Sequence, residues 1–170
     1  GFVVVPYDDV EAVERAVNKN TVGILVEPIQ GEAGVVVPKE GFLKGLERIA
    51  KKNNVLLAVD EIQTGFCRTG KTFAFQHEGI DPDIIIMGKA LGGGVFPVSA
   101  VAADKKILGV FQPGTHGSTF GGNPLGCAVA LAAIDVLMEE KIADKAAELG
   151  AYYIERIPKN NSPKIKLHRP

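Results

Sequence analysis

Short, almost entirely apolar runs recur along this chain and constrain its fold more than any other feature. They lie at 22–26, 55–59, 84–87 and 98–102, and segments with helically spaced apolar residues or clustered glycines separate them. Strands that are apolar on both faces belong to sheets covered by helices, and such sheets are mostly parallel. The sequence therefore predicts an α/β fold with a mostly parallel sheet flanked by helices.

The intervening segments carry helix signals. Asp8 and Asp9 precede an apolar stripe that they could cap, and Pro38 is expected to open a second helix. Asn123 followed by Pro124 combines a preferred N-cap with a preferred first helical residue. Besides strand-like residues 3–5, we expect helices over 10–17, 38–54, 72–77, 123–139 and 141–157, and a linker from 158 to 170.

The composition is that of an ordinary globular chain. Of its 170 residues 46% are hydrophobic, and the formal net charge is −1, which suits one domain with a sizeable core. The sequence contains neither the basic face that nucleic acids need nor an apolar stretch of transmembrane length, and no signal peptide is recognised. Cys67 and Cys127 stand outside any CxxC pattern, so reduced thiols of a cytoplasmic protein are expected.

Two chemically capable side chains follow neighbouring apolar runs. Lys89 stands two residues beyond the run 84–87, and Asp60 follows the run 55–59 directly. Ligands of open α/β sheets bind beyond the carboxyl ends of the strands, where Glu27 is expected as well. An amine that forms a Schiff base and a carboxylate that holds a pyridine nitrogen protonated are what pyridoxal 5'-phosphate requires. The alternatives are a solvated surface lysine and an aspartate that merely caps a turn.

The residues after Asp60 extend this interpretation. If the strand geometry continues, Asp60 and Ile62 point to the same side, so Ile62 would pack against the cofactor ring and Gln63 would reach the ring hydroxyl. We expect Lys89 to be desolvated, since imine formation needs a neutral amine.

A polar, glycine-rich segment over 115–124 immediately precedes the expected long helix. Its amides and hydroxyls suit a phosphate group, although many loops before helices look alike. His116 lies in this segment, but no partner stands at metal-ligand spacing, so a structural histidine and no metal site are expected.

Motifs at 26–34, 60–65, 88–90 and 116–124 occur in an order that resembles class III (ω-amino) aminotransferases. The resemblance covers about residues 3–157 and is strongest to the ornithine-converting members of bacterial type. It implies the large cofactor-binding domain of fold type I pyridoxal-phosphate enzymes for residues 1–157, with 158–170 leading to a C-terminal small domain.

The resemblance also assigns roles to individual residues. Lys89 would be the Schiff-base lysine and proton shuttle. The cofactor ring would be bound by Asp60, Ile62 and Gln63. Thr119, with Ser118, would bind the cofactor phosphate in the partner subunit of a homodimer or higher homo-oligomer. Glu32 would tune substrate recognition between the two half-reactions.

The implied reaction moves the δ-amino group of L-ornithine to 2-oxoglutarate and yields glutamate 5-semialdehyde and glutamate, within proline and arginine metabolism. Acetylornithine or another ω-amino acid is the alternative donor. The chain opens on Gly1 and ends on Pro170 without a capped element. We therefore expect a piece of a longer protein that lacks the upstream phosphate loop, the ring-stacking aromatic residue and the arginine partner of Glu32. A second alternative is thus an α/β fragment without activity of its own.

Overall fold

The computed structural model describes residues 1–157, and within this range four strands form one sheet in the order β1-β2-β3-β4. The strands are β1 (Gly23–Val26), β2 (Leu56–Asp60), β3 (Ile84–Met87) and β4 (Ala100–Ala103). β1, β2 and β3 pair in parallel, whereas β4 is antiparallel to β3. The α/β class and the mostly parallel sheet are confirmed. The linker expected over 158–170 lies outside the described residues.

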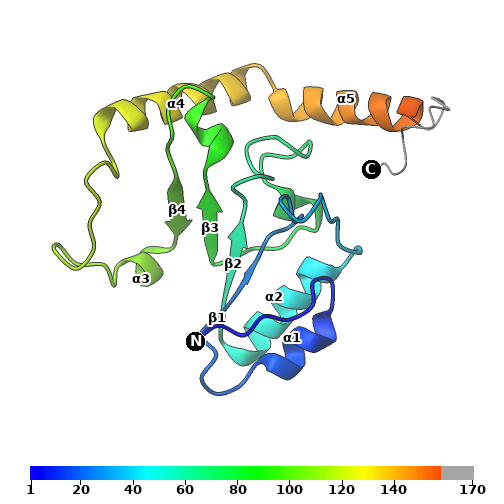
Figure 1. The fold of residues 1–170 in the computed structure, drawn as a ribbon, viewed down its shortest axis with the longest axis vertical. Coiled ribbons are helices and arrows are strands. Elements are labelled where there is room, and N and C mark those ends of the chain that lie inside the picture. The colour runs from blue at the N-terminus through cyan, green and yellow to red at the C-terminus, as the bar shows by residue number, and fades with distance from the viewer. Residues whose placement is uncertain (158–170) are drawn as a thin grey trace.

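Helices lie on one face of the sheet and across its upper end (Figure 1). In chain order they are α1 (Val10–Ala16), α2 (Phe42–Asn53), the 3-10 helices η1 (Ala74–His77) and η2 (Lys89–Gly92), α3 (Lys105–Leu108), α4 (Pro124–Glu139) and α5 (Ile142–Arg156). Helices α4 and α5 follow one another as a long rod above the strands (Figure 1). Within residues 1–157, no helix combines the length and the apolar composition that a bilayer crossing requires.

The core lies between α2 and the β1–β2 pair. Burial alternates along β2, so that Leu57 and Val59 are buried while Asp60 is half-buried. On α2 the apolar residues recur at helical spacing, and Leu46 and Ile49 are each only 1% exposed. The face of β2 that carries Leu57 and Val59 thus anchors the sheet. Asp60 emerges on the other side of the strand.

Local signals located several elements correctly. The Asn123 side chain accepts a hydrogen bond from the backbone N–H of Gly126, with Pro124 as the first residue of α4. Asp9 caps α1 in the same way by accepting from the backbone N–H of Ala12.

Other expectations about secondary structure were wrong. Residues 3–5 form no strand, and α2 begins at Phe42 instead of Pro38, because Gly41 adopts the left-handed conformation that ends the preceding turn. The last strand starts at Ala100 instead of residue 98. It is antiparallel to β3, and the connection between them holds only the short 3-10 helix η2 and not the longer helix that usually joins parallel strands. The short helix α3, capped by Asp104, was not expected.

Candidate active site

The predicted site residues at the ends of the parallel strands come together. Val26, the last residue of β1, pairs with Val59, and Asp60 pairs with Ile86 of β3. Glu27, Asp60 and the segment after Met87 therefore meet at one edge of the sheet, as expected for the carboxyl ends of parallel strands. Lys89 follows at the start of η2.

Glu32 links two of the predicted cofactor residues. One of its carboxylate oxygens, Oε1, accepts a hydrogen bond of 2.7 Å from Gln63 Nε2 and lies 3.5 Å from Lys89 Nζ. Gln63 folds over Gly31, where an added Cβ atom would clash with the Gln63 side-chain amide. The absence of a side chain at Gly31 thus allows Gln63 to reach Glu32. Side chains from three separate parts of the sequence converge on one small region.

Lys89 is more exposed than the sequence suggested. Its side chain is 53% exposed in the structure of residues 1–157, so the expectation that the amine is desolvated is wrong. Its backbone is unusual, because φ is +43°, a left-handed conformation that L-residues other than glycine rarely adopt. Strained backbone of this kind clusters at functional sites. The conformation turns the chain sharply at the end of β3, directly beside Gly88.

Asp60 and Ile62 are held by local contacts. The Asp60 Oδ1 atom accepts a 2.9 Å hydrogen bond from the backbone N–H of Ile62, which is a turn of the kind considered as the alternative for this aspartate. Ile62 lies against Gly88, since a Cβ atom at Gly88 would sit 3.5 Å from Ile62 Cγ2. The turn and this contact bring Asp60, Ile62 and the residue before Lys89 into one neighbourhood.

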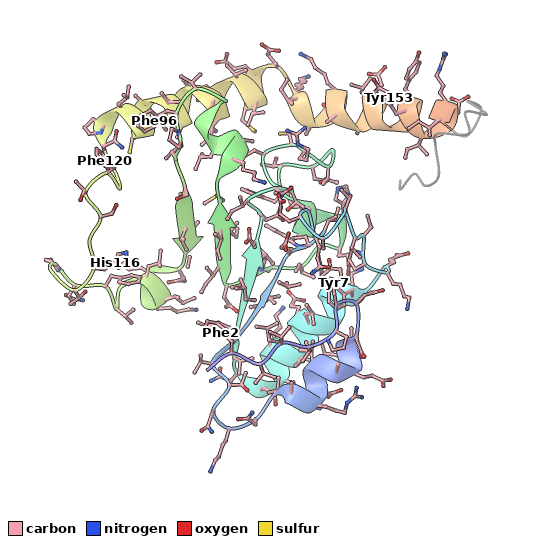
Figure 2. The ribbon with its side chains drawn as sticks, in the orientation of Figure 1. Phe2, Tyr7, Phe96, His116, Phe120 and Tyr153 are labelled. Atoms are coloured by element: carbon pink, nitrogen blue, oxygen red, sulfur yellow. The ribbon has the colours of Figure 1, made fainter. Side chains whose placement is uncertain are left out.

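The structure does not bring Ser118 and Thr119 to this cluster. Both are exposed and lie on the connection between α3 and α4, which runs beyond the β4 edge; Figure 2 labels the neighbouring His116 and Phe120 there. Ser118 Oγ accepts a hydrogen bond from the backbone N–H of Gly121. The ring of His116 contacts Phe111 at 5.3 Å between centroids. In the described part of the chain, no group of three or more His, Cys, Asp or Glu side chains is placed to hold a metal ion.

A cavity of about 840 Å³ lies under α4; Met87 and Leu91 on either side of Lys89 line it, whereas Lys89 itself does not. Its lining is mostly apolar and comes from the segments 66–73 and 87–100, from the segment 118–123 that includes Ser118, and from one side of α4. Cys67 and Cys127 both line it, and both are free thiols. Burial raises the pKa of the Cys67 thiol, which keeps it protonated and unreactive. No converging charged groups mark this cavity as the chemical site.

The sequence analysis placed Glu27 at a strand end, but it did not predict that Tyr7 and Glu27 support the Glu32 segment. The Tyr7 hydroxyl donates to the backbone carbonyls of Glu27 and Pro28, each at 3.0 Å, and burial raises the pKa of Tyr7 far above its ordinary value, so it remains a donor. The Glu27 carboxylate accepts from the backbone N–H of Gly31 at 3.0 Å. The position of Glu27 at a strand end was the available signal, whereas Tyr7 offered none.

Comparison with known proteins decides the family. The sequence profile of the family described as Aminotransferase class-III matches residues 5–168. The chain belongs to the class III aminotransferases.

Individual class III aminotransferases are very similar to it. Ornithine aminotransferase of Brevibacillus brevis is 61% identical over 98% of this chain and 42% of its own length. The structure of ornithine aminotransferase from Toxoplasma gondii, described with partial occupancy of PLP at its active site, superposes with a TM-score of 0.95 at 50% identity, over 99% of this chain and 41% of that chain. The structure of acetylornithine aminotransferase from Elizabethkingia anophelis superposes with a TM-score of 0.90 at 55% identity, over 94% of this chain and 40% of that chain. This chain thus spans about two fifths of the length of the relatives that it matches.

Proposed function

We propose that this chain is part of a pyridoxal-phosphate-dependent transaminase. The enzyme would transfer the δ-amino group of L-ornithine to 2-oxoglutarate and yield glutamate 5-semialdehyde and glutamate. The convergence of Lys89, Gln63 and Glu32 beside Asp60 carries the proposal, and the 61% identity to an ornithine aminotransferase supports ornithine as the substrate. Because the chain spans 42% of that relative, the activity is proposed for a polypeptide of the relatives' length that contains it, called the complete protein below.

The residues present fit the cofactor. An exposed amine on Lys89, a carboxylate on Asp60, the amide of Gln63 and the apolar side chain of Ile62 lie at one sheet edge. Pyridoxal phosphate, when bound, takes up the amino group and delocalises the electrons of the adjacent carbon.

Each residue of this chain then has a defined task. Lys89 would hold the cofactor covalently and move a proton during the exchange. Asp60 would keep the ring nitrogen protonated through its charge. Ile62 would pack against the ring, and Gln63 would donate to the ring hydroxyl in place of Glu32.

The exposed Ser118 and Thr119 lie away from Lys89, which supports their assignment to the cofactor phosphate of a partner subunit. We therefore propose a homodimer or a larger homo-oligomer with shared sites, located in the cytoplasm. Its product would feed proline synthesis, and its substrate belongs to arginine metabolism.

A mixing experiment tests the shared site. Lys89→Ala and Thr119→Ala variants of the complete protein are each expected to be nearly inactive, but a mixed dimer has one site with both defects and one with neither. After subunit exchange, roughly one quarter of wild-type activity should return, because half of the dimers are mixed and each holds one intact site. Pairing Lys89→Ala with Asp60→Ala is the control, since both residues serve the same site and no activity should return. Exchange without recovery in the first mixture would refute a phosphate contact across the subunit boundary.

A substitution at Glu32 tests which amino donor the enzyme prefers. Ornithine must present its δ-amine, whereas glutamate must present its α-amine with both carboxylates bound, so one charged group has to change partners. If the Glu32 carboxylate pairs with an arginine of the complete protein, that arginine cannot bind a carboxylate while ornithine reacts. Breaking the pair would free the arginine to bind a carboxylate of glutamate. Glu32→Ala is expected to slow the ornithine half-reaction about tenfold relative to the glutamate half-reaction, which corresponds to roughly 1.4 kcal/mol. Glu40→Ala, an exposed glutamate of the same connection, is the control and should change neither.

Stopped-flow half-reactions with ornithine, N-acetylornithine, 4-aminobutyrate and glutamate measure this ratio. They also separate the second candidate, acetylornithine transamination, which the 55% identity to the Elizabethkingia enzyme favours. If the wild type reacts fastest with N-acetylornithine, the ornithine assignment is wrong while the family stands.

A further inference from the structure

Glu61 lies between two proposed cofactor residues, Asp60 and Ile62, yet it serves no part of the chemistry proposed above. Its side chain is fully buried, with a relative exposure of 0%. At the end of β2, Glu61 is buried, whereas Asp60 and Ile62 on either side of it are only half-buried. A buried carboxylate is costly unless its oxygens are hydrogen-bonded, so this one needs an explanation.

Both oxygens of the Glu61 carboxylate are occupied by donors from the following segment. Oε2 accepts from the Thr64 hydroxyl at 2.5 Å and from the backbone N–H of Ala74 at 3.1 Å, and Oε1 accepts from the backbone N–H of Phe75 at 2.9 Å. Ala74 and Phe75 are the first residues of η1, whose N–H groups have no partner within the helix. The carboxylate thus caps η1 and closes the loop 64–73 onto the end of β2.

The main chain of Glu61 fixes a third element. Its backbone N–H donates to the carbonyl of Ile86 at 2.9 Å, which joins the end of β2 to the end of β3 just before Gly88 and Lys89. Its carbonyl accepts from the N–H of Gly65, also at 2.9 Å. Among residues 1–157 the ion pairs do not include Glu61, so these hydrogen bonds are the polar contacts that hold its side chain.

These contacts restrict rotation of the chain at residues 60–62. Turning Asp60 or Ile62 away from the site requires the Glu61 carboxylate to leave its donors, which would place an unpaired charge in the core. The same movement would break the link between Glu61 and Ile86, and with it the spacing between Asp60 and Lys89.

We infer that Glu61 is a positioning residue: its buried carboxylate holds the 60–63 turn in the orientation that presents Asp60 and Ile62 to the cofactor bound at Lys89. This inference rests on the proposed function. It adds a residue that touches neither substrate nor cofactor and acts through its two neighbours in sequence.

The test compares Glu61→Gln with Glu78→Gln in the complete protein. Glu78 is a matched control, because its carboxylate also accepts from two backbone amides, those of Leu43 and Lys44, at the start of α2, away from the Lys89 cluster. The Glu61→Gln side chain keeps its shape but turns an NH₂ group toward N–H donors. Amide hydrogen exchange of Ala74 and Phe75 in the cofactor-free protein should then accelerate at least about tenfold, as expected when a local opening becomes easier.

Catalytic readouts separate positioning from stability alone. Glu61→Gln should lower kcat for ornithine about 100-fold with little change in KM, the effect expected of a misplacement near 1 Å, and should shift the absorption band of the bound cofactor. Glu78→Gln should lower Tm comparably while leaving the band and kcat within about twofold of wild type. Thr64→Val, which removes one donor and keeps the carboxylate, should give a smaller change of the same kind as Glu61→Gln.

The outcomes are distinguishable. If Glu61→Gln lowers Tm but retains the wild-type band and kcat, Glu61 only stabilises the fold and the inference is overturned. If the wild type itself attaches no cofactor at Lys89, the proposed function fails, and the positioning role fails with it even when the hydrogen-exchange effect is found.

Discussion

Replacing Lys89 with alanine should abolish transamination by the complete protein, with a loss of about 10⁴-fold or more, the upper range of general acid–base catalysis. The covalent attachment and the proton transfer depend on the same amine, so both are lost together. Borohydride treatment of the wild type should fix the cofactor on the peptide that contains Lys89, and Lys89→Ala should show no such adduct. Peptide mass spectrometry and steady-state rates with ornithine measure both effects.

Lys71 and Lys105 provide controls. Both are exposed lysines outside the cluster of Lys89, Gln63 and Glu32. Their alanine variants should keep the adduct and at least about half of the wild-type rate, in line with surface substitutions generally. An adduct found on Lys71 or Lys105 would show that the amine was wrongly assigned.

The backbone of Lys89 adds a separate expectation about stability. Because φ is +43°, glycine should fit this position better than any L-residue. Lys89→Gly should therefore be more stable than Lys89→Ala by about 1 kcal/mol, although both are inactive. Equal Tm values for the two variants would mean that the turn at Lys89 is not strained.

The parts of the fold that could be predicted depend on local signals. Asn123 and Pro124 begin α4 as expected, because cap and first-turn preferences act within a few residues. The apolar run that became β2 was recognisable because strands of mostly parallel sheets are rich in apolar residues, although only one face of β2 is fully buried here. Placing Asp60 and Lys89 at one edge then required only the rule that parallel strands end together.

Other features depended on contacts between distant residues. Glu32 meets Gln63 across 31 positions and Lys89 across 57, and no local pattern specifies such a pairing. The burial of Glu61 was equally hidden, because a glutamate between Asp60 and Ile62 looks like a solvated charge until the start of η1 supplies its donors. The exposure of Lys89 was misjudged since the apolar run before it is only half-buried in residues 1–157.

Replacing Asp60 with asparagine should separate its two possible roles. The asparagine carbonyl can still accept from the backbone N–H of Ile62, so the turn seen here should persist and the protein should fold. The negative charge that keeps the ring nitrogen protonated is lost, however, and activity should fall by about 10²–10³-fold, the range seen when one electrostatic partner of developing charge is removed. Asp60→Ala should lose the same activity and, because the turn loses its hydrogen bond, about 1 kcal/mol of stability as well.

The measurements are kcat for ornithine, Tm, and cofactor attachment to Lys89, which both Asp60 variants should retain because the amine is intact. Asp83→Asn is the control, since the Asp83 carboxylate also accepts from a backbone N–H, that of Leu57, at the opposite end of β2. Its asparagine carbonyl can still accept that hydrogen bond, so Asp83→Asn should leave both Tm and kcat close to wild type. Near-normal turnover in Asp60→Asn would leave Asp60 as a turn-capping residue only, and the ring nitrogen would then need a different partner. Asp60→Asn and Asp60→Ala both remove the charge, but only Asp60→Asn keeps an acceptor for the Ile62 N–H. If both variants lose activity and only Asp60→Ala loses stability, the charge serves the cofactor and the hydrogen bond serves the turn.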